Sequence, residues 1–309
     1  MSRAFIRTAA FLTGLALLLT LLGQMYQPKD NIVGNGINAL KANGFLAYEP
    51  EELDAVFIGC SLFYRCVDPL QIWGEQGITS YNISSSAQRC YEDDRYLHMV
   101  LGRLRPKVIL LDGYSIVRPG FADDAVFTSC SVAFPVLQYH NNWKRYDLST
   151  VLQAPEYTNR VKQKGYRPAG GVTPITWGDY MDPTDERDEM PLLNRLYLAH
   201  MAAVCRRAGV ELAIVTPPSP ANWDMATHNA LQADADWLGI PLYDLNLELE
   251  TLGMDPEKDF LDPGDHLNVD GAEKVNCWLG ELLARRYGLP DHREDPDYAH
   301  WQWEYQKYG

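Results

Sequence analysis

Short apolar runs alternate with longer amphipathic segments from residue 54 onward. Five runs have the composition and glycine boundaries of strands: 54–59, 77–84, 107–113, 210–218 and 240–245. Helical patterns that end near a glycine or a basic residue occupy 93–105, 190–209, 222–239 and 271–288. Strands joined by helical crossovers predict a parallel sheet of about five strands with helices on both faces, which is a three-layer α/β/α fold.

Residues 114–188 interrupt this alternation. The region is rich in Pro, Gly, Tyr and Asp and shows no long periodic helix. Because a loop of this length inside a compact domain is often functional, we expect an excursion over the mouth of a site. The tail, 291–309, predicts a short helix packed on the domain surface, with Trp301, Trp303 and Tyr305 in packing and a partner surface as the alternative.

The N-terminus carries an apolar segment without charge from Thr8 to Tyr26, after Arg3 and Arg7. Its length lies between the apolar region of a signal peptide and the roughly 20 residues that span a bilayer. No small-residue cleavage site or nearby cysteine for lipid attachment is visible, so an uncleaved anchor is favoured over a signal peptide or a buried helix. The two arginines predict a cytoplasmic N-terminus and an extracytoplasmic domain.

These patterns predict four parts of the chain. Residues 1–29 form a cytoplasmic stub and transmembrane anchor, and 30–52 form a linker. Residues 53–290 form the α/β domain with its excursion at 114–188, and 291–309 form the aromatic tail.

Composition narrows the possible partners. The 309 residues are 46% hydrophobic, which is enough for one large core or two modest ones. A formal net charge of -14, without a run of Lys and Arg, argues against nucleic acid as a partner. Six scattered cysteines contain no CxxC pair, so they suggest no zinc site, and disulfides or buried thiols both remain open. No metal or cofactor is predicted.

Candidate chemistry gathers at the carboxyl ends of the predicted strands, where an open parallel sheet binds its ligands. Gly59-Cys60-Ser61 ends the first strand, and Asp112-Gly113 ends the third. A serine at this edge suits a nucleophile if a base lies within hydrogen-bond reach. The best base is His266, in the acidic, turn-rich segment FLDPGDHLNVDGAEKV (260–275). The alternative is that Asp265-His266 caps the final helix.

Three segments together resemble the ordered blocks of the SGNH, or GDSL, hydrolase family. They are Ser61 in GCSL, Asn82 in YNISSSAQ and the late DPGDHLNVDGA. The resemblance covers most of residues 53–288 and implies a flavodoxin-like fold with a Ser-His-Asp esterase site. It is closest to the membrane-anchored branch, whose members act on cell-surface polymers beside membrane-bound O-acyltransferases. The GxSxG of α/β-hydrolases is excluded, because Phe63 replaces its second glycine.

The chain departs from the family pattern around both catalytic groups. The Asp that usually stands three residues before the His is replaced by Pro263, which leaves Asp262 and Asp265. Asp262 is favoured because the Pro-Gly turn can bring it under the imidazole. The family's Asn after the third strand is absent from Asp112-Gly113-Tyr114-Ser115.

The oxyanion hole implied by the resemblance therefore has several candidate donors. The family's glycine donor aligns with Ser84, so the backbone N–H groups of Ser61 and Ser84 form the predicted hole. Asn82 or Ser115 is the expected side-chain substitute. In the excursion, His140 and Trp143 are candidate sugar contacts, with a structural His-Trp pair as the alternative.

The sequence thus predicts a membrane-anchored, extracytoplasmic serine esterase or O-acyltransferase. Ser61 attacks an acyl ester, His266 acts as base and then acid, and Asp262 orients His266. The substrate class is an acylated, chiefly acetylated, cell-surface glycan or a small ester. The alternative hypothesis is a non-catalytic SGNH-fold accessory protein that binds a polymer or a membrane-bound O-acyltransferase.

Overall fold

The computed structural model describes residues 3–31, 42–145 and 153–309. The chain divides into two compact units. The first unit comprises Met1–Val33 with Phe121–Asn159, and the second comprises Gly34–Gly120 with Arg160–Gly309. The second unit contains residues 53–120 and 160–290 of the predicted α/β domain, together with the tail.

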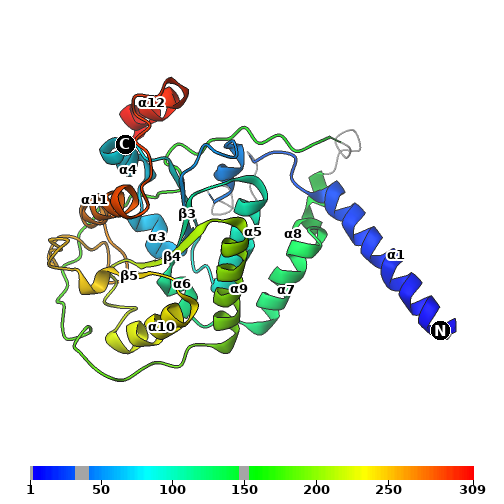
Figure 1. Cartoon of the computed structure of the whole chain (residues 1–309), viewed down its shortest axis with the longest axis horizontal. Helices are drawn as coiled ribbons and strands as arrows, with labels where there is room; N and C mark the ends of the chain where they lie inside the picture. The colour runs from blue at the N-terminus through cyan, green and yellow to red at the C-terminus, as the bar shows by residue number, and fades with distance from the viewer. Residues whose placement is uncertain (1–2, 32–41, 146–152) are drawn as a thin grey trace. The chain divides into compact units, whose positions relative to one another are not determined.

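A five-stranded parallel sheet forms the centre of the second unit (Figure 1). Its strands are β1 (Ala55–Gly59), β2 (Ser80–Ser84), β3 (Val108–Asp112), β4 (Glu211–Thr216) and β5 (Leu242–Asp244), in the spatial order β2-β1-β3-β4-β5. This is the flavodoxin-like order, so the predicted fold class and all five predicted strands are confirmed. Every residue of β1, β2 and β3 is buried, because helices cover both faces of the sheet.

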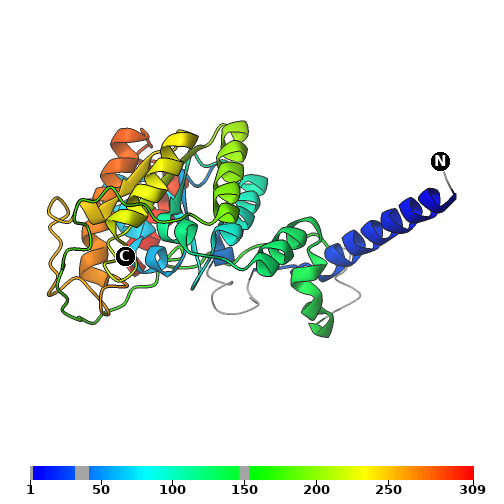
Figure 2. The same ribbon diagram turned by 90° about the horizontal axis from the view of Figure 1, so that it is seen from below.

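Helices pack on the two faces of this sheet. They are α3 (Ser61–Cys66), α4 (Pro69–Gln76), α5 (Cys90–Arg103), α6 (Gly113–Val117), α9 (Leu192–Ala208), α10 (Met225–Leu238), α11 (Val269–Arg286) and α12 (Ala299–Tyr308), with short 3-10 helices η1 (Asn43–Ala47), η3 (Leu245–Leu247) and η4 (Pro296–Tyr298). Alternate residues of β1 enter two separate cores. Val56 and Ile58 join the core with α5 and α9, while Ala55 and Phe57 join the core with α3 and α11. Figure 2 shows α5 and α9 side by side.

The segment around Lys164 covers the outer edge of β2. The carbonyl oxygen of Lys164 accepts the N–H of Asn82 at 2.9 Å. Gly165 has a φ of +95°, and a Cβ there would lie 1.8 Å from the Asn82 oxygen, so this approach requires glycine.

The predicted helix of the aromatic tail is α12, and it contacts α4. Glu304 forms an ion pair with the buried Lys164 ammonium, which also lies 4.2 Å from the centre of the Trp301 ring. Burial lowers the pKa of Lys164 to about 8. Trp301 is fully buried, whereas Trp303 is exposed. One of the two tail tryptophans therefore has the packing role that the sequence predicted.

The first unit contains α1 (Arg3–Tyr26), α7 (Ala122–Ala133), α8 (Val136–Tyr139) and the 3-10 helix η2 (His140–Arg145). The mean hydropathy of α1 reaches 2.0, and the helix is long and apolar enough to cross a membrane, a test that a signal sequence also passes. It packs on α8, where Gly23 lies beside Pro135.

The region between residues 114 and 188 differs from its prediction. We expected no long helix there, but α7 has 12 residues. Its apolar side chains do not form one buried stripe, since Val126 and Phe127 are both exposed, and the helical signal is correspondingly weak. The region is also divided between the units, with residues 121–159 in the first and 160–188 in the second.

All six cysteines are free thiols. Cys60, Cys66, Cys90 and Cys205 are buried, and Cys130 and Cys277 are exposed. The sequence left disulfides and thiols as alternatives, and the structure shows thiols.

Candidate functional site

Ser61 lies at a tight turn between β1 and α3, at the carboxyl edge of the sheet. It is the first residue of α3, and Cys60 before it has extended backbone angles. A Cβ on Gly59 would lie 2.2 Å from Cβ of Asp112, so the two strand ends approach closely only because residue 59 is glycine. Ser61 is partly exposed, and its hydroxyl makes no hydrogen bond to the residues that the structure describes.

The buried carboxylate of Asp112 joins this turn to the turn after β3. Its Oδ2 accepts the backbone N–H of Cys60 at 3.0 Å and the Cys60 thiol at 2.9 Å, while its Oδ1 accepts the N–H of Tyr114 at 3.0 Å. Burial raises the pKa of the Cys60 thiol, and the neighbouring Asp112 adds to this rise, so Cys60 stays protonated as a donor. Asp112 therefore positions the chain on both sides of the site.

His266 lies in the loop between β5 and α11, and Asp262 holds its imidazole. Asp262 Oδ2 lies 2.7 Å from His266 Nδ1, while Oδ1 accepts the N–H groups of Asp265 and His266 at 3.0 and 2.8 Å. Gly264, with a φ of +85°, provides the turn that folds Asp262 back toward His266.

Asp265 is the weaker partner of the same imidazole. Its Oδ2 lies 3.3 Å from His266 Nδ1, and its Oδ1 instead accepts a hydrogen bond from the Asn222 amide at 2.6 Å. Its side chain is also more exposed than that of Asp262, at 44% against 31%. The geometry thus favours Asp262 as the orienting carboxylate.

The other ring nitrogen of His266, Nε2, is buried and has no hydrogen-bond partner among the described residues. The Ser61 hydroxyl is therefore not hydrogen-bonded to it in this structure. A buried polar nitrogen without a partner is uncommon and calls for an explanation. In the tautomer whose Nδ1–H donates to Asp262, Nε2 carries the lone pair that can accept a proton. Catalytic hydrogen bonds are often long before substrate binds.

The side chains of the two predicted oxyanion donors, Asn82 and Ser115, make hydrogen bonds within the protein. The Asn82 amide is buried and donates to the carbonyl oxygens of Phe63 and Val67 at 2.8 and 3.0 Å. The Ser115 hydroxyl is buried and hydrogen-bonds to Asp93 at 2.5 Å. Both side chains hold the interior together, so neither can donate to a substrate. The Ser84 hydroxyl is also buried and bonds to Asn82, so only its backbone N–H remains a prediction.

Two polar residues of this edge were missed by the sequence analysis. The Tyr114 hydroxyl donates to Asn222 Oδ1 at 3.0 Å, and the Asn222 amide in turn donates to Asp265. Burial raises the pKa of Tyr114, so its hydroxyl keeps its proton. Each residue follows a predicted strand within a few positions, and this placement is the signal that could have identified both.

The two sugar-contact candidates lie in the first unit. His140 Nδ1 lies 2.7 Å from the carbonyl oxygen of Leu137, in its own helical turn. The side chain of Trp143 lies outside the described side chains. Their proposed contact with substrate stays a prediction.

Two clusters have side chains of the kinds that bind metals. The ligand atoms of Asp262, Asp265 and His266 lie within 4.8 Å of one another, as do those of Asp94, His98 and His200. In the first cluster, the 2.7 Å separation between Asp262 Oδ2 and His266 Nδ1 is that of a charge-assisted hydrogen bond. We therefore interpret the first cluster as a carboxylate that orients the His266 imidazole.

Comparisons with known proteins give only distant similarities. No family model and no curated protein sequence matches the chain. Similar solved structures include a protein from Bacteroides fragilis NCTC 9343 described as an acylhydrolase, with 10% identity, a TM-score of 0.40 and coverage of 82% of this chain and 97% of that one. A protein from Desulfitobacterium hafniense DCB-2, described as a lipolytic protein of the G-D-S-L family, has 11% identity, a TM-score of 0.40 and coverage of 74% and 98%. An acetyl xylan esterase has 12% identity, a TM-score of 0.39 and coverage of 73% and 98%. These values are too low to assign an activity.

Proposed function

We propose that this chain is a membrane-anchored serine esterase or O-acyltransferase of the SGNH type. The observation that carries the proposal is the state of His266. Asp262 holds the Nδ1 atom of His266, and the Nε2 atom of His266 is buried and has no hydrogen-bond partner among the described residues. Ser61 follows β1 at the carboxyl edge of the sheet. This is the arrangement that a general base requires before its nucleophile and substrate align.

In the proposed reaction, the Ser61 hydroxyl attacks an acyl carbon and its proton passes to His266 Nε2. The Asp262 carboxylate stabilises the imidazolium that forms. His266 then protonates the leaving alcohol oxygen, which leaves an acyl group on Ser61. Water or a sugar hydroxyl next gives its proton to His266 and attacks this acyl group. The bond to Ser61 breaks as His266 returns the proton to the serine oxygen, which releases an acid or a new ester and restores the free enzyme.

The Tyr114 hydroxyl is the side-chain donor that we assign to the oxyanion hole, together with the backbone N–H groups of Ser61 and Ser84. It is half-buried and protonated, and Asp112 fixes the turn that carries it. It also lies in the stretch where the resembled family has its asparagine. A hydroxyl that donates to Asn222 in the free protein can rotate toward a developing negative charge.

Tyr114→Phe is expected to lower kcat by about 10²–10³-fold, the usual cost of one oxyanion donor, with little change in KM. The measurement is steady-state hydrolysis of a short-chain nitrophenyl ester. Tyr243→Phe is the matched control, because it removes a hydroxyl whose partner is Tyr287, at 3.3 Å, a residue with no assigned role. Equal kcat values for the Tyr114 variant and the wild type would exclude the assignment.

The proposed substrates are acyl, chiefly acetyl, esters of cell-surface glycans. The apolar α1 supports an anchor, and Arg3 and Arg7 support a cytoplasmic N-terminus with the α/β domain outside. The net charge of -14 favours neutral or acetylated glycans over polyanionic polymers. Protease treatment of intact cells tests this topology, since an extracytoplasmic domain is digested without lysis.

A second function is favoured by one observation. Ser61 and His266 are not hydrogen-bonded, which suits an accessory protein that binds a polymer or a membrane-bound O-acyltransferase without catalysis.

A fluorophosphonate probe separates these two functions. We expect the full-length protein in detergent to acquire an adduct on Ser61, located by peptide mass spectrometry. If the protein is folded, as cooperative unfolding would show, and still gains no adduct on Ser61, the accessory function is supported instead. Profiling of the unlabelled protein on acetylated glycans and model esters then identifies the acyl group and acceptor.

A further inference from the structure

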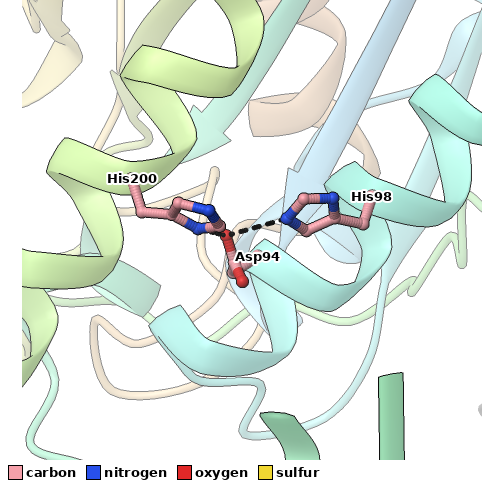
Figure 3. Close-up of side chains that lie close together, drawn as sticks. All are labelled: Asp94, His98 and His200. Atoms are coloured by element: carbon pink, nitrogen blue, oxygen red, sulfur yellow. Dashed lines mark hydrogen bonds and ion pairs between the residues drawn. The ribbon is translucent and has the colours of Figure 1, made fainter. Parts of the chain in front are cut away.

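A second cluster of reactive side chains lies between α5 and α9. Asp94 and His98 are four residues apart on α5, so both project from one face of that helix. His200 projects from α9, which packs against α5. Figure 3 shows both imidazole rings directed at the carboxylate of Asp94. None of these residues belongs to the proposed esterase mechanism.

The three donor atoms have nearly the spacing of a metal site. Asp94 Oδ1 lies 2.8 Å from His200 Nδ1 and 3.9 Å from His98 Nε2. The two ring centres are 5.2 Å apart, and all three donor atoms lie within 4.8 Å of one another. Tetrahedral zinc, with bonds of about 2.0–2.2 Å, places its ligand atoms roughly 3.4 Å apart. This spacing lies between the two measured distances of 2.8 and 3.9 Å.

Hydrogen bonding accounts for the positions of only two of the three side chains. Asp94 and His200 form a hydrogen bond, but 3.9 Å is too long for one from His98. Within the described residues, neither ring nitrogen of His98 has a hydrogen-bond partner. A cation at the centre would engage all three groups at once.

Burial and charge also fit a cation. The Asp94 side chain is only 11% exposed, whereas those of His98 and His200 are 36% and 49% exposed. The carboxylate thus lies at the base of the cluster, and the imidazoles leave an entry path from solvent. The net charge of -14 favours cation approach.

We propose that Asp94, His98 and His200 bind one Zn²⁺, with water in the fourth position. Two imidazoles and one carboxylate suit zinc rather than Mg²⁺ or Ca²⁺, which prefer oxygen ligands. The bound ion would cross-link α5 and α9. The proposal is independent of the esterase function, because the cluster uses only side chains of these two helices.

The test measures zinc binding to the full-length protein, purified in detergent through a tag without histidine. After EDTA treatment and dialysis, the wild type is expected to bind one Zn²⁺ per chain and to unfold at a higher temperature with Zn²⁺ than with EDTA. Mg²⁺ should give neither result. His98→Ala and His200→Ala should weaken binding by more than the ~10–100-fold that loss of an outer-shell partner costs.

His98→Ala is the decisive variant, because His98 makes no hydrogen bond to the described residues that its removal would break. In EDTA it should unfold within about 2 °C of the wild type, as exposed substitutions do, and zinc should no longer raise its unfolding temperature. His300→Ala is the matched control, since His300 is 35% exposed and its carboxylate partner is Glu52, far from the cluster in the sequence. Wild type that binds no zinc, or His98→Ala that binds it unchanged, overturns the proposal.

Discussion

Ser61→Ala is expected to lower ester hydrolysis by about 10⁴–10⁶-fold and to abolish the fluorophosphonate adduct, because the acyl group then has no nucleophile to receive it. The residual rate comes from binding and the oxyanion donors. The measurement combines kcat on a nitrophenyl ester with mass spectrometry of the labelled peptide.

Ser86→Ala is the control for Ser61→Ala. Ser86 is an exposed serine in the turn after β2, near the same edge of the sheet, and it has no assigned role. Its variant should keep both labelling and activity. If Ser61→Ala retains hydrolysis near the wild-type rate, another residue is the nucleophile, and the proposed mechanism fails.

Asp262→Asn is expected to lower kcat by up to about 10⁴-fold, because an amide allows the wrong tautomer of His266 and cannot stabilise its imidazolium. KM should change little. The rate of fluorophosphonate labelling should fall with kcat, since both depend on removal of the Ser61 proton.

Asp265→Asn provides the matched comparison. Asp265 is 44% exposed and 3.3 Å from the same ring nitrogen, so its loss should cost at most about fivefold, the range of an exposed ion pair. The structure thus predicts a large difference in kcat between the Asp262 and Asp265 variants. A larger loss of kcat in the Asp265 variant would reverse the assignment of the orienting carboxylate.

The sheet could be predicted from the sequence because its strands are buried on both faces. Such strands are short apolar runs, and each observed strand lies inside its predicted range. The short α3 and α4 were missed, since 6 and 8 residues are too few to establish a helical period. Helix α7 was missed because its exposed apolar side chains blur the periodicity.

The candidate site could be predicted only in part. Ser61 and His266 are placed by strand ends and loops, which leave a signal in the sequence. Preference for Asp262 depended on the turn that Gly264 allows, and the geometry agrees with that preference. The direction of a buried side chain carries no such signal, so the sequence could not show that Asn82 and Ser115 bond to the interior. The same limit hid the contact between Tyr114 and Asn222, which are distant in sequence.

The cover over β2 has a consequence for folding. An unpaired edge strand can template pairing with another chain, and here the backbone of Lys164 occupies that edge. Lys164 is in turn held by Glu304 and Trp301, which belong to the last helix of the chain. The edge is therefore secured by a contact between residues 140 positions apart in the sequence. Until α12 docks, the sheet can form with this edge still open to pairing with another chain.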